Sequence, residues 1–272
     1  MKKICSILLL LLAASFFNST EVSAQGTRRL RVVVLTDIEA DPDDTQSMIR
    51  FLLYCNEWDV EGLIATTSIH QQTRVAPESV LKILDAYKKV QPNLIKHEKG
   101  YPSYDQLKPL VKKGLPVYGM NGVGEGKDSE GSNWIVKVLE KNDDRPVWFC
   151  AWGGPNTLAQ ALWKIKNTKS GADADRLYNK VRIYTISDQD DSGPWIRNTF
   201  PSIFYIVTPG YNYTHATWLG MSFPAPGSNS EVVSNDWLAK NIQQGHGPLG
   251  AAYPDVAYGM EGDMPSLTVR RL

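Results

Sequence analysis

Hydrophobic and polar residues alternate along the chain in a pattern typical of strands followed by helices. A continuous apolar run at 29–37 (RLRVVVLTD) predicts a strand buried on both faces. Apolar residues at helical spacing follow within 43–56, and acidic residues at its start are placed to cap that helix. The apolar run at 60–67 predicts a second strand, and 77–90 predicts an amphipathic helix that begins with proline.

The rest of the chain continues this alternation with one interruption. Residues 91–128 are rich in proline, glycine and lysine and predict irregular structure, with a short helix near 104–113. Beyond them we expect helices at 132–142, 154–166 and 232–242, and strands at 145–152, 180–188 and 202–208. Strands that alternate with helices predict an α/β fold with a mostly parallel sheet flanked by helices, a Rossmann-like architecture.

Three of the predicted strands end in residues that carry chemistry. The first leads into the acidic stretch 37–44, the third into AWGGPNT at 151–157, and the fourth into SDQDDSGPWIRN at 187–198. Ligands of open parallel sheets bind outside the carboxyl ends of the strands. We therefore expect these three segments to form one site.

The acidic stretch holds five carboxylates within eight positions: Asp37, Glu39, Asp41, Asp43 and Asp44. Carboxylates this close repel one another, and a hard cation that binds several oxygens removes the repulsion. Such an ion also lowers the pKa of a bound water. The stretch therefore favours a calcium site.

Other interpretations of the acids remain open. Capping of the next helix by Asp43 or Asp44 accounts for one or two acids, but not for five. An EF-hand loop needs Gly and Glu where this chain has Pro42 and Met48, and a strand rather than a helix precedes the loop. An aspartyl nucleophile of the phosphatase type would also follow a first strand.

Several motifs resemble nucleoside hydrolases in order and content. The segment LTDIEADPDDTQSM (35–48) is similar to their N-terminal fingerprint, and AWGGPNTLAQAL (151–162) to their second motif. The chain more closely resembles an exported branch, the nucleoside hydrolase-like domain of a family named after a bacterial cellulose-binding protein. That resemblance also includes IYTISDQDDSGPWIRNTFP, HGPLGAAYP and EGDMPS, and it implies a nucleoside hydrolase-like fold over 25–272.

The resemblance implies roles for residues of the first two motifs. Asp37 corresponds to the aspartate that both binds calcium and acts as general base. Asp44 corresponds to a second calcium ligand, and Asp43 to a neighbour that holds sugar hydroxyls. Trp152 lies where a main-chain carbonyl completes the calcium site.

The third motif implies substrate contacts. Asp188, Asp191 and Asn198 are the candidates for binding the sugar, without a ranking among them. Trp195, like Trp152 and Trp218, lies in a loop near the expected site, where an aromatic ring can stack on a sugar or base; otherwise it belongs to the core.

The C-terminal part departs from the family pattern. Nucleoside hydrolases carry a His-Asp pair there, whereas here Gly247 follows His246. We expect Asp263 to supply the late calcium ligand, with Glu261 as the alternative. His246 is the candidate to protonate the leaving group, unless it is a structural residue of its turn.

The first residues resemble an export signal. Two lysines, an apolar stretch and the small residues Val-Ser-Ala precede a cleavage site after Ala24, and the apolar stretch of about 14 residues is short for a membrane span. We expect a signal peptide at 1–24, a periplasmic location and no stable membrane span. Without Lys2, Lys3 and Glu21, 27 basic and 28 acidic residues remain, so nucleic acid is not an expected partner.

Composition and cysteines add little to these expectations. With 272 residues, of which 42% are hydrophobic, the chain can form one sizeable core. Cys55 and Cys150 lie in apolar contexts, which favours buried free thiols over a disulfide. The related proteins continue past the segment MPSLTVRRL, so we expect the domain to be truncated at its C-terminal end.

Taken together, the sequence predicts an exported, calcium-dependent hydrolase of glycosyl bonds, N-glycosyl or related. Its substrate would be a small nucleoside or carbohydrate, and a homo-oligomer remains open. The alternative is a non-catalytic carbohydrate-binding protein on the same fold, for cellulose or another plant glycan. A third interpretation, an aspartyl phosphatase, would require magnesium-dependent phosphate release.

Overall fold

The fold is a parallel sheet between two layers of helices. The computed structural model describes residues 28–208, 227 and 230–255, and all structural statements concern these residues. Within them six strands pair in parallel in the order β3-β2-β1-β4-β5-β6. The strands are β1 (Leu30–Thr36), β2 (Trp58–Ala65), β3 (Val111–Lys113), β4 (Val147–Ala151), β5 (Val181–Thr185) and β6 (Phe204–Val207).

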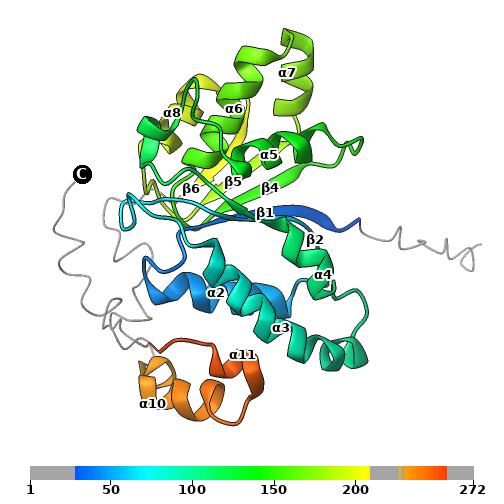
Figure 1. Ribbon diagram of the computed structural model, residues 1–272, viewed down its shortest axis with the longest axis vertical. Coiled ribbons are helices and arrows are strands. Elements are labelled where there is room, and N and C mark those ends of the chain that lie inside the picture. Colours follow the sequence, from blue (N-terminus) through cyan, green and yellow to red (C-terminus); the bar gives the residue numbers. More distant parts are fainter. Residues whose placement is uncertain (1–27, 209–226, 228–229, 256–272) are drawn as a thin grey trace, which may run out of the picture.

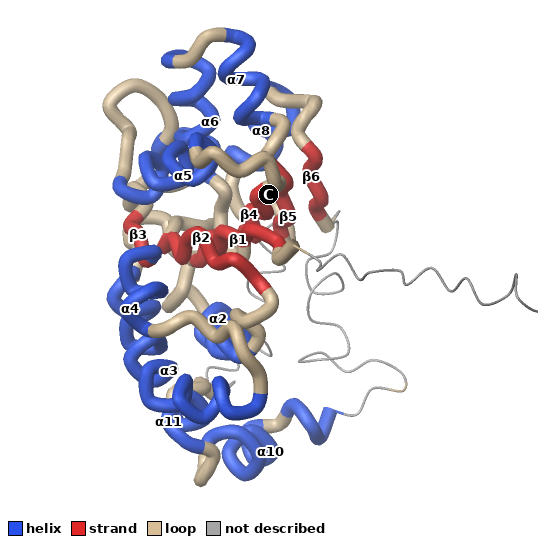
Figure 2. The backbone as a smooth tube through the Cα atoms, turned by 90° about the vertical axis from the view of Figure 1, so that its right-hand side faces the viewer, coloured by secondary structure: helices blue, strands red, loops and turns tan. Residues whose placement is uncertain are grey.

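Helices cover both faces of this sheet. The α-helices are α2 (Pro42–Leu53), α3 (Pro77–His97), α4 (Tyr104–Leu107), α5 (Glu130–Glu140), α6 (Asn156–Thr168), α7 (Gly171–Tyr178), α8 (Ser192–Thr199), α10 (Asn235–Leu238) and α11 (Gly247–Ala251). Shorter helical turns are η1 (Lys108–Leu110), η2 (Gly119–Gly122), η3 (Ser230–Val233) and η4 (Ala239–Gln243). Figures 1 and 2 show α5 to α8 on one side of the sheet, and α2, α3, α10 and α11 on the other.

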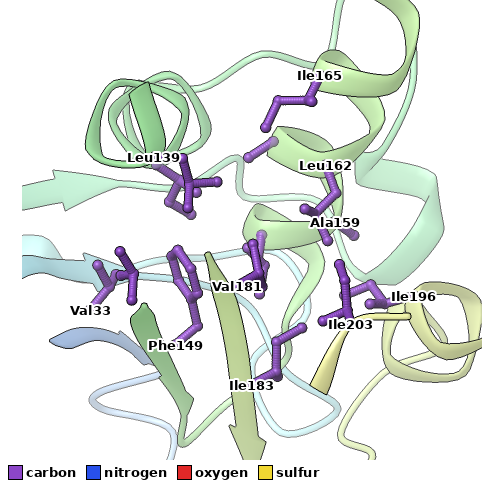
Figure 3. Close-up of a cluster of buried hydrophobic side chains, with 14 of the residues drawn as sticks. Val33, Leu139, Phe149, Ala159, Leu162, Ile165, Val181, Ile183, Ile196 and Ile203 are labelled. Atoms are coloured by element: carbon purple, nitrogen blue, oxygen red, sulfur yellow. The ribbon is translucent and has the colours of Figure 1, made fainter. Parts of the chain in front are cut away.

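Each face of the sheet packs on its own hydrophobic core. Side chains of a strand point alternately to opposite faces, so β1 contributes to both cores. Val33 and Leu35 belong to the core under α5 to α8, which also contains Phe149 and Leu162 (Figure 3). Val32 and Val34 belong to the core under α2 and α3. Burial on both faces explains why β1 is apolar without alternation.

The α/β class and the parallel sheet predicted from the sequence are confirmed. The prediction of irregular structure over 91–128 was wrong in two places, since α3 continues through Pro92 to His97 and β3 lies within that segment. Strand β3 has only three residues, two of them lysines, so its structure depends on pairing with β2 rather than on a pattern of its own. The short helices α7, α8 and α11 were also not expected.

The topology creates one preferred place for a ligand. Strand order runs outward in one direction from β1 to β3 and in the other from β4 to β6. The direction of the strand order therefore reverses between β1 and β4. Ligands of doubly wound sheets bind beyond the carboxyl ends of the strands at such a point. Asp37 follows β1 and Trp152 follows β4, so both lie at this reversal.

Two further expectations can be compared with the fold. Cys55 and Cys150 are free thiols, as the sequence predicted. None of the described helices is long and apolar enough to span a membrane. The expected signal peptide at 1–24 lies outside the described residues.

Candidate functional site

The two aspartates predicted as metal ligands are buried together at the end of β1. Asp37 and Asp44 are each about 5% exposed. The Thr36 hydroxyl donates a hydrogen bond to Oδ2 of Asp44 and accepts one from the Ile38 N–H at 3.2 Å. Burial, together with the nearby charges of Asp37 and Asp43, raises the pKa of Asp44 well above its ordinary value. The fold therefore holds two carboxyl groups in a repulsive, poorly hydrated position.

The start of α2 is not capped as the sequence predicted. The N-cap residue is Asp41, and no side chain accepts a capping hydrogen bond. Asp43 instead accepts a hydrogen bond from the Asp44 N–H at 2.9 Å. Burial and the charge of Asp37 raise the pKa of Asp41, and the charge of His70 acts against this rise. Among the described residues, no donor reaches the buried Oδ1 of Asp41. These acids are thus not explained by helix capping.

Glu39 has a different role from the other acids of the loop. Its backbone φ is 77°, in the left-handed region that non-glycine residues rarely adopt. Its carboxylate accepts a hydrogen bond from Ser79 and forms an ion pair with Arg74. The hydrogen bond from Ser79 and the charge of Arg74 lower the pKa of Glu39. Glu39 therefore ties the loop to α3 and is neutralised by the protein itself.

The double glycine after β4 packs between two buried acids. A Cβ atom on Gly153 would lie 2.8 Å from the carboxyl group of Asp37, and one on Gly154 would lie 2.2 Å from Oδ2 of Asp190. Both distances are shorter than real Cβ contacts, so only glycine allows this close approach. The turn therefore depends on glycine at both positions.

The main chain before the double glycine presents the carbonyl that the sequence predicted as a ligand. The Trp152 N–H donates to the Leu35 carbonyl at 2.8 Å, which fixes the turn beside β1. The Trp152 carbonyl accepts a hydrogen bond from Nε2 of Gln189 at 2.6 Å. The Trp152 ring contacts Phe51 edge-on, with 6.2 Å between ring centroids. The carbonyl thus lies in a defined position next to the residue that touches Asp37.

The substrate-binding candidates of the third motif differ in their surroundings. Asp188 forms a two-point ion pair with Arg197, at 2.7 and 2.8 Å. Asp191 is exposed, and its Oδ1 accepts a hydrogen bond from the Met120 N–H at 2.7 Å. Asn198 is exposed on α8, and Trp195 packs edge-on against Phe200 of the core, with 5.5 Å between ring centroids. The structure brings Asp188 and Asp191 to the carboxyl end of β5, whereas Trp195 lies on the core side of α8.

Asp190 is a buried acid that the sequence interpretation did not single out. Its Oδ1 accepts hydrogen bonds from the N–H (2.8 Å) and the hydroxyl of Ser192, and its Oδ2 has no donor. Burial raises the pKa of Asp190 to about 6, although the hydrogen bonds from Ser192 oppose the shift. In the sequence, the available signal for Asp190 was its place two residues before a serine at the start of a helix. Only its contact with Gly154 in the structure shows where Asp190 lies.

The C-terminal candidates are not assembled with the buried acids in the described part of the chain. His246 is exposed at the N-terminus of α11, where its ring contacts the Lys240 carbonyl at 3.2 Å. Helix α11 lies beside α3 in the lower helical layer of Figure 1. Asp263, Glu261 and Trp218 lie outside the described residues, so the late metal ligand stays a prediction.

The donors at the strand ends suit a hard cation, although acids alone do not complete a site. Within residues 28–208 and 230–255, no group of three His, Cys, Asp or Glu side chains could hold a metal ion. Asp37, Asp44 and the Trp152 carbonyl offer only oxygen, which calcium prefers, and neither buried carboxyl forms an ion pair with another residue of the described part of the chain. The residues present therefore fit calcium if further oxygens join them.

Comparisons with known proteins identify a family and a similar solved structure. A family model described as cellulose-binding Sde182, nucleoside hydrolase-like domain, matches residues 31–270. The solved structure of a nucleoside hydrolase-related hypothetical protein from Saccharophagus degradans, associated with carbohydrate metabolism, is 42% identical, with a TM-score of 0.74. That match covers 88% of this chain and 54% of the other, so the chain spans about half the length of that protein.

More distant proteins contribute less. A plant nucleoside hydrolase, the PpNRh1 enzyme, is 14% identical, with a TM-score of 0.47 over 86% of this chain and 73% of its own. No protein among the curated sequences matches this chain significantly.

Proposed function

This chain belongs to the family described as cellulose-binding Sde182, nucleoside hydrolase-like domain, and on that premise we propose that it is an exported, calcium-dependent hydrolase of glycosyl bonds in carbohydrates. The observation that carries the proposal is the buried pair Asp37 and Asp44 at the reversal of strand order. A structural protein gains nothing from burying Asp44 beside a second carboxylate that raises its pKa, whereas a site that binds a cation and activates water requires such a pair.

The chain's own residues account for most of the proposed chemistry. Bound calcium would lower the pKa of a coordinated water and neutralise the carboxylates. Asp37 is the general base that accepts a proton from the attacking water, a contribution of roughly 10²- to 10⁴-fold in rate. Asp44, oriented by the Thr36 hydroxyl, and the Trp152 carbonyl hold the cation. Asp43 lies in the first turn of α2 beside them and is the candidate to hold sugar hydroxyls, which favours positive charge on the ring.

The proton for the leaving group has no assigned donor in this proposal. Its family counterpart is the histidine of the late His-Asp pair, and His246, the N-cap residue of α11, contacts the Lys240 carbonyl of η4 instead. A good leaving group lessens the need for such a donor. Export, expected from the leader, and the carbohydrate association of the S. degradans protein both support a glycan fragment over a nucleoside as substrate.

The test is a screen of the whole protein against nucleosides and plant cell-wall oligosaccharides, with calcium or with a chelator. Release of reducing sugar that needs calcium is the expected result. Asp37→Asn should abolish turnover while circular dichroism and thermal unfolding stay close to those of the wild type. Turnover that survives this change would contradict the role of Asp37.

A second function is favoured by the position of His246. If no donor reaches the leaving group, the protein is a carbohydrate-binding module in which calcium holds a loop in shape. That function predicts that the wild type binds glycans saturably and turns over no substrate. It also predicts that Asp37→Asn, kept folded by a stabilising salt in place of calcium, binds glycans with the same affinity as the wild type. The same screen, combined with calorimetric titration of oligosaccharides, separates the two functions.

A further inference from the structure

We propose that the side-chain amide oxygen of Gln189 is a ligand of the cation site, in addition to the hydrogen bond by which this side chain directs the Trp152 carbonyl. The inference rests on the proposed function, because it completes the same site. It concerns a residue between β5 and α8 that is not acidic and that no motif singles out.

The main chain of Gln189 is held by two other loops. Its carbonyl accepts hydrogen bonds from the Ile69 N–H at 2.9 Å and from the Tyr118 hydroxyl at 3.3 Å. The residue is about 5% exposed. Two residues beyond Ile69, the Gln71 side chain donates to the Asp37 carbonyl at 3.3 Å, so the same loop contacts both sides of the site. Gln189 is thus fixed where the ends of β1, β2 and β5 meet.

The orientation of the amide is decided by its neighbour. Nε2 lies 2.6 Å from the Trp152 carbonyl oxygen, which can only accept. The reverse orientation would place two acceptors in contact, so the nitrogen must face Trp152. Oε1 of Gln189 is therefore turned away from Trp152, and it is buried without a hydrogen-bond donor.

A buried amide oxygen without a hydrogen-bond donor destabilises the fold, and a bound ion is one of the few explanations for retaining one. Because this atom has no solvent access, it lies too deep for a sugar ring to contact it. The Gln189 amide bonds the Trp152 carbonyl, and Gly153, the next residue, packs against the Asp37 carboxyl group. The amide and that carboxylate are thus connected through a single peptide unit.

The chemistry of the donor set supports an amide ligand. Calcium takes six to eight oxygens, and amide carbonyls are among its usual ligands. Asp37, Asp44 and the Trp152 carbonyl supply too few, and no third acidic side chain of the described chain joins them. An amide oxygen adds a ligand without adding a third negative charge to two carboxyls that already repel each other.

The test measures calcium binding rather than activity. The whole protein is titrated with calcium by calorimetry, and the calcium-induced shift in melting temperature is recorded in parallel. Gln189→Leu removes both the oxygen and the N–H, whereas Gln189→Glu keeps an oxygen and removes the N–H. We expect Gln189→Leu to weaken calcium binding at least about tenfold, and Gln189→Glu to bind calcium as tightly as the wild type or more tightly.

Gln160→Leu is the matched control. Gln160 is a buried glutamine of α6 whose amide bonds Gly124 and Asp128, away from the site. Its loss should lower stability without changing calcium affinity. If Gln189→Leu does not fold, the calcium affinity of Gln189→Glu tests the proposal by itself. Retained calcium affinity supports an oxygen ligand at position 189, and lost calcium affinity contradicts it.

The outcomes separate this inference from the proposed function. Calcium binding by the wild type that Gln189→Leu leaves unchanged, or that both variants weaken equally, overturns the ligand role and leaves the hydrolase proposal intact. Absence of calcium binding by the wild type overturns both.

Discussion

Strand β1 carries a buried charge at each end, and the two ends are treated in opposite ways. At the amino end Arg31 is fully buried and donates to Glu61 at 2.9 Å and to the Val138 carbonyl at 2.8 Å. At the carboxyl end Asp37 and Asp44 are as deeply buried, and neither forms an ion pair with any described residue. A charge cluster that serves the fold is neutralised by the protein, whereas one that serves binding retains a need for a partner.

The largest expected effect concerns the neutralised end. Arg31→Ala removes the fully buried partner of Glu61 and leaves it only the half-exposed Lys141, and breaking a buried pair costs about 3–5 kcal/mol of unfolding free energy. Urea unfolding measures the loss. The double variant Arg31→Met with Glu61→Gln should recover much of it, since no buried charge is then left unpaired and Lys141, which loses Glu61, is half exposed. A loss below about 1 kcal/mol in Arg31→Ala would remove the basis of the comparison.

The second prediction concerns pH and Asp190, the buried acid between β5 and α8 that lies against Gly154. The folded pKa of Asp190 is about 6, above its ordinary 3.8, so the folded state holds this proton more tightly than the unfolded state. The contribution of Asp190 to stability is therefore largest below its ordinary pKa, falls as pH rises through the window between the two pKa values, and is constant above it. The fall amounts to about 3 kcal/mol.

Asp190→Asn should remove that part of the pH dependence. The check is the unfolding free energy of the calcium-free wild type and variant, measured from about pH 4 to about pH 7. Curves of equal slope would show that Asp190 does not titrate as its burial implies. Calcium should stabilise the wild type by about 2.7 kcal/mol at a hundred times its dissociation constant, if the site binds it.

The third prediction tests whether the glycine turn fixes the position of Asp37 at the unneutralised end of β1. Gly153→Ala places a methyl group 2.8 Å from the Asp37 carboxyl, so that side chain must move. Overpacking of this kind costs about 1–3 kcal/mol, and calcium affinity should fall with it. Gly171→Ala is the control, because a Cβ there meets nothing within 4 Å. An equal response of both variants would mean that the glycine turn does not constrain Asp37.

The smallest effect is expected where an acid of the same loop is neutralised at the surface. Arg74 is 55% exposed and pairs with Glu39. Arg74→Ala should cost about 0–1 kcal/mol, and less at high salt, because solvent screens exposed pairs. Thermal unfolding at two salt concentrations measures it. A loss as large as that of Arg31→Ala would place Glu39 among the buried, functional acids.

Much of the fold followed from local pattern. Strands β1, β4 and β5 are apolar runs long enough to be recognised, and their carboxyl ends carry the polar segments that the sequence placed at one edge. Strand β3 and helices α7, α8 and α11 are short, so their existence depends on neighbours that a local window does not contain.

The candidate site was predictable in part. Asp37, Asp44 and Trp152 come from segments that end neighbouring strands, and parallel topology alone brings them together. Asp190 and Gln189 could not be ranked against Asp188 and Asp191, because six polar residues in a row, Ser187 to Ser192, give no sign of which is buried.

By itself the sequence determined which strand ends carry acids, glycines and amides, because alternation of apolar and polar residues specifies a parallel sheet and its carboxyl edge. Only the tertiary structure decided which of those groups are neutralised. Glu39 is paired by Arg74 from another loop, whereas Asp44 has Asp37 as its neighbour and no ion pair with a described residue. Solvation and charge depend on what surrounds an atom in space, and those surroundings come from residues far apart in the chain.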